Sequence, residues 1–384
     1  MTNARHAVSY TLAAVLALAL GCGTSAKKEP RSNESAGHPD WTAFHRGGPL
    51  RGATDPLPPG TLRVRWTAKA GAGSISSAVI AGDTVYFGGG DGHFRAYAIA
   101  DGTVKWDYAV EATVFVTPLL LHGRLYFGDG AGVMHAISAA DGSSVWTYRT
   151  GSEIKSSANA TGKRILFGSY DNNLYCLDAA TGRLVWKFET TAQVHATPAV
   201  IENLTFTGGC DAALRAVDLE SGTEAWAAEM GSPVPTAPLG FGGTVVVGSM
   251  GGDIACFSLG DGSEIWRQSV ENESFFAGGA YEDGLVVAPG RERGLYCFDA
   301  LTGAPVWQRA SRGGFEGSPA IAGDRVYAPC KDGRLYVYDL HSGDAVESFE
   351  AGGAIEGSVS IGGGVVVVCS EVGDLFCLEP APAE

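Results

Sequence analysis

The sequence predicts an all-β protein, an eight-bladed β-propeller whose blades are four-stranded antiparallel sheets. A Gly four residues before a Trp returns with a period of about 40 residues, as in TGRLVW, which ends at Trp186. Each period holds apolar stretches of strand length between Gly, Asn and Asp turns, and no segment shows a helical period. The chain contains 55 Gly, as expected of many short strands joined by tight turns.

The third period shows how one blade is built. Its four expected strands are EIKSSANA (153–160), RILFGSY (164–170), LYCLDAATG (174–182) and RLVW (183–186). A single sheet of this size cannot bury both of its faces, so one period is not a stable unit. Closing a series of such sheets into a ring covers every face, which is the propeller arrangement.

The number of blades follows from the position ten residues before each Trp. A small residue occupies it in all eight periods: Ala96, Ala136, Cys176, Ala216, Cys256, Cys297, Val337 and Cys377. The eighth period stops before its own Trp strand, and LRVRWTAKA around Trp66 supplies the missing strand. We therefore expect an N-terminal strand to complete the last blade and remove the open edges of the ring.

The repeated Trp residues are expected to be structural. Their large flat side chains suit packing between neighbouring sheets, and the preceding Gly suits a tight turn that strains other residues. Stacking on a ligand is the alternative role. The set comprises Trp66, Trp106, Trp146, Trp186, Trp226, Trp266 and Trp307, while Glu347 stands in the Trp position of the seventh period.

The first 21 residues are predicted to be a lipoprotein signal peptide. A short polar start precedes the apolar run AVSYTLAAVLALAL (7–20), which is too short for a stable membrane span. The run ends in ALGC, which resembles a bacterial lipobox and implies lipidation (palmitate among the acyl chains) at Cys22. Ala19 departs from the preferred Leu, and an ordinary secreted protein is the alternative. Gly23 after the cysteine, instead of Asp, implies retention in the outer membrane of a Gram-negative cell.

Residues 22–40 are expected to form the lipidated cysteine and a disordered tether, because the stretch is polar and free of large apolar residues. Residues 41–384 are expected to form the propeller. The net charge of −15 argues against nucleic-acid binding, which requires a basic surface.

The blocks TGRLVW, SPAIAGDRVY and KDGRLYVYDL resemble the repeat of the quinoprotein-like (PQQ-repeat) β-propellers, and the likeness covers residues 41–384. The segment DWTAFHRGGPLRG (40–52) is also typical of bacterial members. With eight blades and a lipoprotein start, the chain looks most like the BamB family. That resemblance implies a non-catalytic membrane-anchored scaffold for protein–protein interaction in outer-membrane β-barrel assembly, without a cofactor, on the periplasmic face, and monomeric outside its complex.

Two other functions stay open. The first is an envelope binding module for another protein or a polysaccharide. The second is a PQQ-dependent dehydrogenase, which resembles the chain in its repeats. Those enzymes are usually much longer and carry an adjacent Cys pair and a calcium site; this chain has neither the length nor the Cys pair.

Contacts with a partner are predicted at the mouth of the central channel. The position three residues before Pro118, taken around the ring, reads Ile75, Phe115, Lys155, His195, Pro235, Phe275, Glu316 and Glu356. Across an eight-bladed ring Phe115 would face Phe275, Lys155 would face Glu316, and His195 would face Glu356. Aromatic and charged groups at a concave mouth suit peptide or protein recognition. A solvated lining without a role is the alternative, and an acid–base or cation-binding pair of Glu316 and Glu356 is a further one.

The cysteines do not predict a metal or haem site. Those in the small-residue position of the repeat are expected to be buried apolar residues. Cys369 and Cys377 lie across one hairpin from each other and could pair. The sequence has no C-x-x-C and no C-x-x-C-H, so neither a metal nor a cofactor is predicted.

Overall fold

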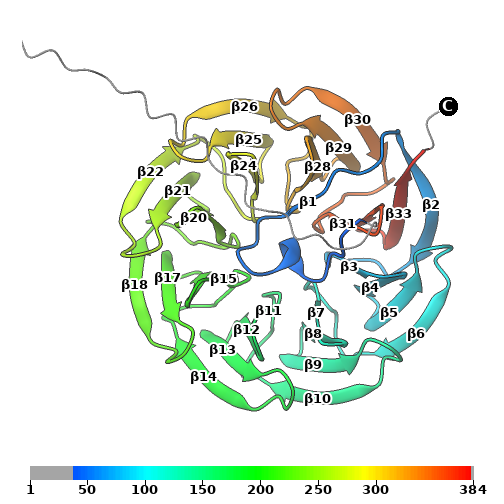
Figure 1. The fold of residues 1–384 in the computed structure, drawn as a ribbon, viewed down its shortest axis with the longest axis horizontal. Coiled ribbons are helices and arrows are strands. Elements are labelled where there is room, and N and C mark those ends of the chain that lie inside the picture. The colour runs from blue at the N-terminus through cyan, green and yellow to red at the C-terminus, as the bar shows by residue number, and fades with distance from the viewer. Residues whose placement is uncertain (1–37, 382–384) are drawn as a thin grey trace, which may run out of the picture. The chain divides into compact units, whose positions relative to one another are not determined.

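The computed structural model describes residues 38–381; the predicted signal peptide (1–21), Cys22 and most of the predicted tether (22–40) lie outside the described residues. Within residues 38–381, eight β-sheets are arranged in a ring around a central channel, which confirms the predicted fold class (Figure 1). No helix in this range is long and apolar enough to span a membrane.

The first four blades each contain four consecutive antiparallel strands. Blade 1 holds β3 (Val79–Ala81), β4 (Thr84–Gly88), β5 (His93–Ala98) and β6 (Val104–Ala109). Blade 2 holds β7 (Leu119–Leu121), β8 (Arg124–Gly128), β9 (Val133–Ser138) and β10 (Ser144–Arg149). Blade 3 holds β11 (Asn159–Thr161), β12 (Arg164–Ser169), β13 (Asn173–Asp178) and β14 (Leu184–Glu189). Blade 4 holds β15 (Ala199–Ile201), β16 (Leu204–Gly208), β17 (Ala213–Asp218) and β18 (Glu224–Glu229).

The other four blades follow the same plan, and the last one borrows a strand. Blade 5 holds β19 (Leu239–Phe241), β20 (Thr244–Gly248), β21 (Asp253–Ser258) and β22 (Glu264–Ser269). Blade 6 holds β23 (Ala280–Glu282), β24 (Leu285–Pro289), β25 (Gly294–Asp299) and β26 (Pro305–Ala310). Blade 7 holds β27 (Ala320–Ala322), β28 (Arg325–Pro329), β29 (Arg334–Asp339) and β30 (Ala345–Glu350). Blade 8 holds β31 (Ser360–Gly362), β32 (Val365–Cys369), β33 (Asp374–Pro380) and the N-terminal strand β2 (Leu62–Lys69).

The small residue of each repeat lies directly opposite the Trp on the neighbouring outer strand. In blade 3, Cys176 pairs with Trp186, and in blade 8, Cys377 pairs with Trp66. Both cysteines are completely buried, as are most of the other residues at this position. The small side chain leaves room in the core beside the indole, which explains why only Ala, Cys or Val occupies this position.

Each repeated Trp links its blade to the next one. The indole N–H of Trp186 in blade 3 donates to the carbonyl oxygen of Leu219 in blade 4, at 3.0 Å. Gly222, in the turn of blade 4, has φ +70°, and a Cβ built there would lie 2.6 Å from the Trp186 ring. The motif Gly therefore makes the turn and also makes space for the Trp of the preceding blade. The same bond recurs for Trp66, Trp106, Trp146, Trp226, Trp266 and Trp307.

The ring closes through β2, as predicted. β2 pairs antiparallel with β33 along its length, so a strand from near the N-terminus is the outer strand of blade 8. The junction between blades 7 and 8 has Glu347 where the other repeats have Trp. Its carboxylate accepts a hydrogen bond from the backbone N–H of Leu62, the first residue of β2, at 2.9 Å. The repeat whose Trp is replaced by Glu is thus the one next to the blade in which the N-terminal strand β2 joins the C-terminal strand β33.

Residues 41–54, here called the clasp, form a feature that the sequence did not predict. They include the 3₁₀ helix η1 (Phe44–Arg46) and the short strand β1 (Ala53–Thr54), which pairs in parallel with β27. Figure 1 shows this segment in blue across the centre of the ring. It bonds to the innermost strands of blades 1 to 7 in order, through Ile80, Leu120, Asn159, Val200, Gly240, Tyr281 and Ile321. The clasp therefore ties together blades that share no sheet.

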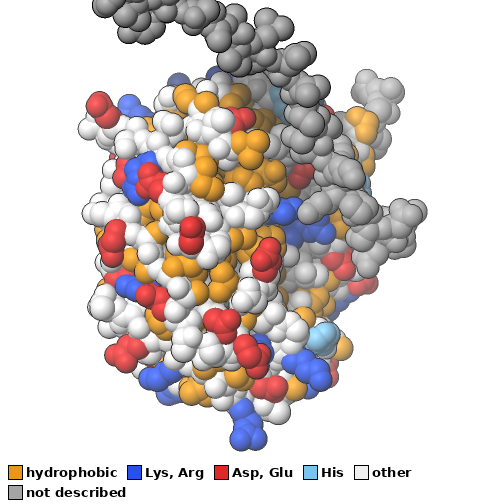
Figure 2. Space-filling model, turned by 60° about the vertical axis from the view of Figure 1, so that its left-hand side comes forward, with side chains coloured by type: hydrophobic (Ala, Val, Ile, Leu, Met, Phe, Trp, Pro, Cys, Tyr) orange, Lys and Arg blue, Asp and Glu red, His pale blue; other side chains and the backbone are white. Residues whose placement is uncertain are grey.

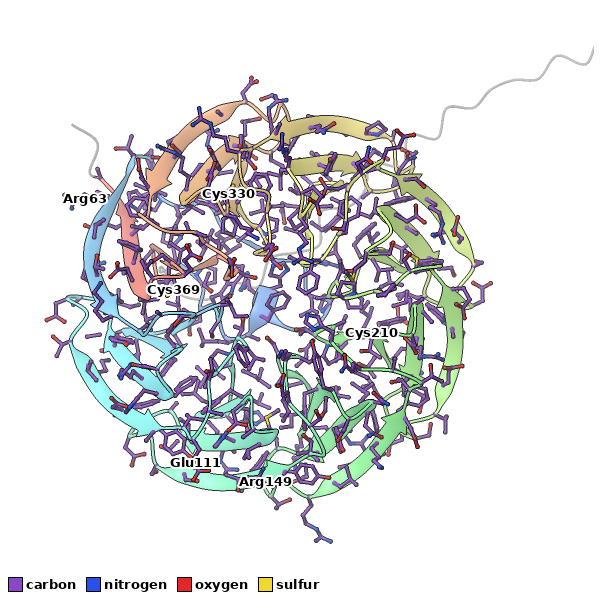
Figure 3. The ribbon with its side chains drawn as sticks, turned by 180° about the vertical axis from the view of Figure 1, so that it is seen from behind. Arg63, Glu111, Arg149, Cys210, Cys330 and Cys369 are labelled. Carbon is purple, nitrogen blue, oxygen red and sulfur yellow. The ribbon has the colours of Figure 1, made fainter. Side chains whose placement is uncertain are left out.

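The suggestion that Cys369 and Cys377 pair is wrong. The hairpin register places Cys369 opposite Leu375 and Cys377 opposite Val367, so the two thiols are not across from each other. Both are free, and burial raises the pKa of each thiol to about 12. Figure 3 shows that Cys210, Cys330 and Cys369 also lie apart on different blades.

The outer strands carry both apolar and charged side chains. Figure 2 shows acidic side chains scattered singly over one side of the ring with apolar side chains between them. Exposed apolar residues on the outer strands include Leu184 (45 % exposed) and Ile265 (49 % exposed), both close in sequence to a repeated Trp. Isolated exposed apolar residues of this kind are normal on a folded surface.

Candidate functional site

The central channel is lined by two rings of side chains that come from the segment entering each innermost strand. Along this segment, residues that line the channel alternate with residues buried between the blades. In blade 2, Phe115 and Thr117 line the channel, whereas Val114 and Val116 are buried. The same alternation in the other blades produces an upper ring at the mouth and a lower ring of mostly small hydroxyl residues.

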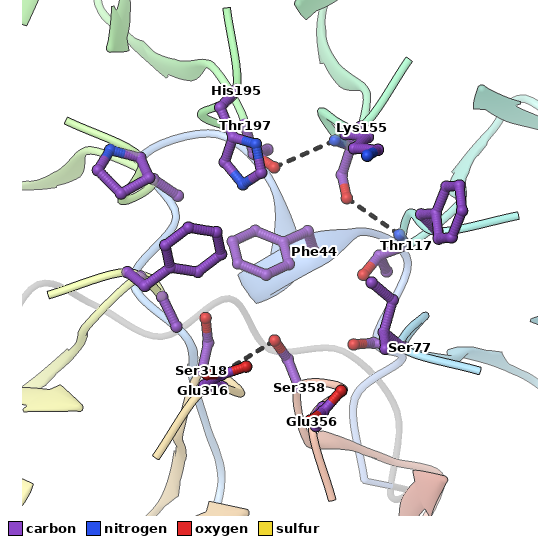
Figure 4. A pocket seen from close by; sticks show the side chains of 18 residues that line it. Phe44, Ser77, Thr117, Lys155, His195, Thr197, Glu316, Ser318, Glu356 and Ser358 are labelled. Carbon is purple, nitrogen blue, oxygen red and sulfur yellow. Dashed lines mark hydrogen bonds between the residues drawn. The ribbon is translucent and has the colours of Figure 1, made fainter. Parts of the chain in front are cut away.

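The lower ring and the clasp close the bottom of the cavity. Ser157 accepts a hydrogen bond from the Thr117 backbone N–H at 3.0 Å, and Ser358 accepts one from Ser318 at 3.0 Å. These bonds hold neighbouring blades at a fixed separation. The ring of Phe44, from η1, forms the floor at the centre (Figure 4). The result is a cavity of about 180 Å³.

Of the six aromatic and charged residues predicted at the mouth, five line this cavity: Phe115, Lys155, His195, Glu316 and Glu356. Figure 4 shows Lys155 and His195 on one side of Phe44, with Glu316 and Glu356 on the other. The order of these residues around the channel is therefore as predicted. No ion pair crosses the cavity within residues 38–381, because Lys155 pairs instead with Glu153 of its own blade, at 2.8 Å.

The placement of Phe275 in the channel is wrong. Phe275 is 1 % exposed and packs in the core between blades 5 and 6, and its neighbour Phe276 lines the cavity. The cause is one extra residue between Trp266 and Phe275, a loop that in other blades is one residue shorter. Blade 6 also has Gly279 at the position where four other blades have Pro, so this blade lacks the Pro that marks the register.

Aromatic rings and one cation make up the wall on blades 2 to 6. The Lys155 Nζ lies 5.3 Å from the ring centroid of Phe115 and 5.0 Å from that of Tyr170. The Tyr170 hydroxyl is 2.6 Å from Nδ1 of His195, whose ring centroid is 5.0 Å from that of Phe276. Burial, and then the nearby Lys155 ammonium, lowers the pKa of His195 to about 4. The imidazole is therefore neutral at pH 7, and this wall carries little free positive charge.

Ion pairs make up the wall on blades 6 to 8. Glu316 accepts hydrogen bonds from Arg291 at 2.8 Å and from Lys331 at 3.0 Å. Burial acts to raise the pKa of Glu316, but these two bonds outweigh burial and lower the pKa. Glu356 has only Lys331, at 3.9 Å, as an ion-pair partner in the described part of the chain. Burial, and then the neighbouring Glu316 carboxylate, raises the pKa of Glu356.

Sequence reasoning missed three residues that complete the mouth: Tyr170, Arg291 and Lys331. All three lie in the hairpins between the second and third strands of their blades. A signal existed, because they occupy one position that recurs with the same period as the Trp. Read around the ring, that position is Gly90, Gly130, Tyr170, Cys210, Met250, Arg291, Lys331 and Glu371.

Arg291 is held at the mouth by a buried carboxylate in the longer loop of blade 6. Glu273 is 8 % exposed and accepts hydrogen bonds from the backbone N–H of Glu292 at 2.7 Å and from the Tyr296 hydroxyl at 3.1 Å. These bonds fix the hairpin that carries Arg291. Its guanidinium then lies 5.2 Å from the ring centroid of Phe276 while it bonds to Glu316.

Solved structures of several functions share this fold. The structure of BamB from Moraxella catarrhalis is 17 % identical, with a TM-score of 0.73, and the match covers 84 % of this chain and 99 % of that one. A europium-containing methanol dehydrogenase is 12 % identical, with a TM-score of 0.75, covering 89 % and 98 %. The quinohemoprotein alcohol dehydrogenase from Comamonas testosteroni is 13 % identical, with a TM-score of 0.76, covering 90 % and 82 %. At these identities the likeness shows the fold alone.

The channel residues do not fit a quinone cofactor with its metal. The cavity of about 180 Å³ is smaller than the roughly 300–1,000 Å³ of typical small-molecule sites. Among residues 38–381 no group of three His, Cys, Asp or Glu side chains could hold a metal ion. Of the two carboxylates that line the cavity, Glu316 is already bonded to Arg291 and Lys331.

The family comparison covers nearly the whole propeller. No curated protein sequence matches the chain significantly. Residues 58–161, 154–274 and 250–381 each match the family described as "Outer membrane protein assembly factor BamB". Together the three matches span all eight blades that the structure describes, and the repeat, the ring of eight sheets and the N-terminal closing strand agree with that assignment. The chain therefore belongs to the BamB family of PQQ-repeat β-propellers.

Proposed function

We propose that the protein is a non-catalytic scaffold that binds a protein partner in the cell envelope and takes part in the assembly of β-barrel proteins in the outer membrane. The observation that carries this proposal is the family match over residues 58–381. The channel mouth supports it, because aromatic and charged side chains around a small concave site are typical of protein recognition. The partner-binding residues are Phe115, Lys155, His195, Glu316 and Glu356, with Phe276 in place of Phe275.

The experiment that tests this role is capture of the protein from its own membranes after mild crosslinking, with mass spectrometry of the proteins that come with it. Recovery of a β-barrel insertase with its companion lipoproteins is the expected result. Recovery of a different envelope protein or a polysaccharide, without an insertase, would replace the assembly role with that of a general envelope binding module.

Reversing both carboxylates of the ionic wall, as Glu316→Lys with Glu356→Lys, is expected to reduce partner capture about tenfold or more. The change places two more cations beside Arg291 and Lys331, so a surface that now alternates in sign becomes uniformly positive. Quantitative mass spectrometry of the captured partner measures the effect. Glu189→Lys, an exposed change on the outer strand β14, is the matched control. Undiminished capture by a folded double variant would move the binding surface away from the channel mouth.

Lipidation of Cys22 supplies the membrane attachment in this proposal and rests on the lipobox-like ALGC. Cys22→Ser is expected to move nearly all of the protein from the membrane fraction to the soluble fraction, because the acyl chains are its only proposed anchor. Fractionation of cells that express each form, with immunoblotting, is the measurement. A serine variant that still sediments with membranes would disprove the anchor and leave the propeller assignment unaffected.

A further inference from the structure

The two carboxylates of the mouth are neutralised unequally. Both cations of the ionic wall bond to Glu316, at 2.8 Å from Arg291 and 3.0 Å from Lys331. Glu356 accepts no hydrogen bond among residues 38–381, and Lys331 is 3.9 Å away. Glu356 is therefore a half-buried carboxylate at the wall of a cavity with most of its hydrogen-bonding capacity unused. Binding of a cation would stabilise a half-buried carboxylate of this kind, because the cation would replace the hydration that burial removes.

The opposite wall would not repel a cation. Lys155 is paired with Glu153 at 2.8 Å and is covered by two aromatic rings. His195 is neutral at pH 7 because its pKa is lowered to about 4. The remaining lining of that wall is uncharged and includes the rings of Phe115 and Phe276 beside Pro235, and aromatic faces attract cations.

The size of the cavity limits what can enter. Its volume of about 180 Å³ corresponds to roughly six water molecules at about 30 Å³ each. Phe44 closes the bottom, so an occupant enters from the mouth only. A single long side chain fits this space, whereas a folded segment does not. Hydroxyl groups of the lower ring, such as those of Ser77 and Ser358, add polar contacts at the floor.

We propose that the channel mouth binds the guanidinium group of an arginine side chain presented by a protein partner, with Glu356 as its counter-ion. Guanidinium suits the site better than ammonium, because it is planar, weakly hydrated, stacks on aromatic rings and donates two parallel hydrogen bonds to one carboxylate. This inference rests on the proposed function as a protein-binding scaffold and adds the chemistry of the group that is recognised.

The test compares two blocked tripeptides, acetyl-Gly-Arg-Gly-amide and acetyl-Gly-citrulline-Gly-amide, which differ in charge and hardly in shape. Isothermal titration calorimetry of each peptide with the purified full-length protein at pH 7 is the measurement. The arginine peptide is expected to bind at least about tenfold more tightly, because only a cation pairs with Glu356. Equal binding of the two peptides overturns the proposal.

Two variants locate the binding site. Glu356→Gln keeps the shape and removes the charge, and is expected to abolish the arginine preference, whereas Glu189→Gln on β14 is expected to keep it. Ile75→Arg places a guanidinium on the blade next to Glu356, at a position 39 % exposed, and is expected to block the peptide. If the Glu356→Gln protein does not fold, the binding of the arginine peptide to Ile75→Arg tests the same site. A folded Glu356→Gln or Ile75→Arg protein that keeps the full arginine preference overturns the assignment of Glu356.

The peptide-binding experiment and the partner-capture experiment test different claims, so one can fail while the other succeeds. Arginine-selective binding by a protein that captures no envelope partner would contradict the proposed function and leave the arginine site in place. Capture of an insertase by a protein that does not distinguish arginine from citrulline would contradict only the arginine site.

Discussion

Trp186→Ala is expected to lower the free energy of unfolding by roughly 3–5 kcal/mol, the range for removing a large aromatic side chain from a core. Trp186 is 9 % exposed and packs against Leu166, Leu174 and Cys176 of its own blade. Its indole also holds blade 4 through the bond to Leu219. The substitution therefore leaves a cavity and removes one of the two side-chain hydrogen bonds to the Leu219 carbonyl, which also accepts from Arg164 at 2.6 Å.

Denaturant unfolding, followed by intrinsic fluorescence and circular dichroism, measures the loss. Leu184→Ala is the matched control, because Leu184 lies on the same strand, β14, but is 45 % exposed. The control is expected to change stability by well under 1 kcal/mol. If both substitutions had equal effects, the repeated Trp would not be the element that joins the blades.

Acidification from pH 6.5 to pH 4 is expected to destabilise the propeller, and His45 of the clasp is the main identifiable cause. His45 is 2 % exposed, its ring is stacked on Phe44 at 4.3 Å, and its Nε2 has no hydrogen-bond partner in the described structure. Burial lowers its pKa from 6.5 to about 4, only partly opposed by the nearby backbone of Leu50, whose carbonyl oxygen lies 3.3 Å from Nδ1, and of Gly279.

The direction of the change in stability follows from which state of the protein binds the extra proton. Above pH 6.5 the imidazole is neutral in both states, so His45 contributes no pH dependence. Between pH 6.5 and 4 the unfolded chain binds a proton that the folded chain does not, so stability falls as pH falls, by about 3 kcal/mol in total. Half-buried His195, with its pKa also lowered to about 4, acts in the same direction. Carboxylates with lowered pKa values, such as Glu316, reduce the free energy of unfolding further at more acidic pH, where they become protonated.

Unfolding free energies at a series of pH values between 7 and 4 give the measurement. His45→Asn removes the titrating group and keeps a residue that tolerates the left-handed backbone found there, with φ 47°. His122→Asn is the control, because His122 has φ 49° but is exposed. The His45 variant is expected to show a flatter profile than the control. Identical profiles would mean that the buried imidazole is not the source of the acid sensitivity.

The sequence predicted the structural features that recur in every blade, but it did not predict the clasp, which occurs once. The Trp period and the small residue opposite each Trp predicted the blades, their number and the closing strand β2. The clasp could not be predicted, because its bonds to seven blades join residues that share no repeat and depend on the finished ring. At the channel mouth, one extra residue before Phe275 shifted the register, so Phe276 was missed. Arg291 and Lys331 were missed although their position recurs with the period of the Trp, because the recurrence does not show that this hairpin reaches the channel.

The clasp and the closing strand also determine the order in which the chain can be completed. Residues 41–69 leave the ribosome before any blade, yet their partners extend to the far end of the chain: Arg63 pairs with Glu379, 316 positions later. Such long-range contacts are slow to form and are made after local hairpins. During synthesis, the local hairpins of successive blades can form in turn, before residues 41–69 meet partners that are made later. We therefore expect the segment made before the blades to be placed last, when β2 pairs with β33 and the clasp fills the floor of the channel.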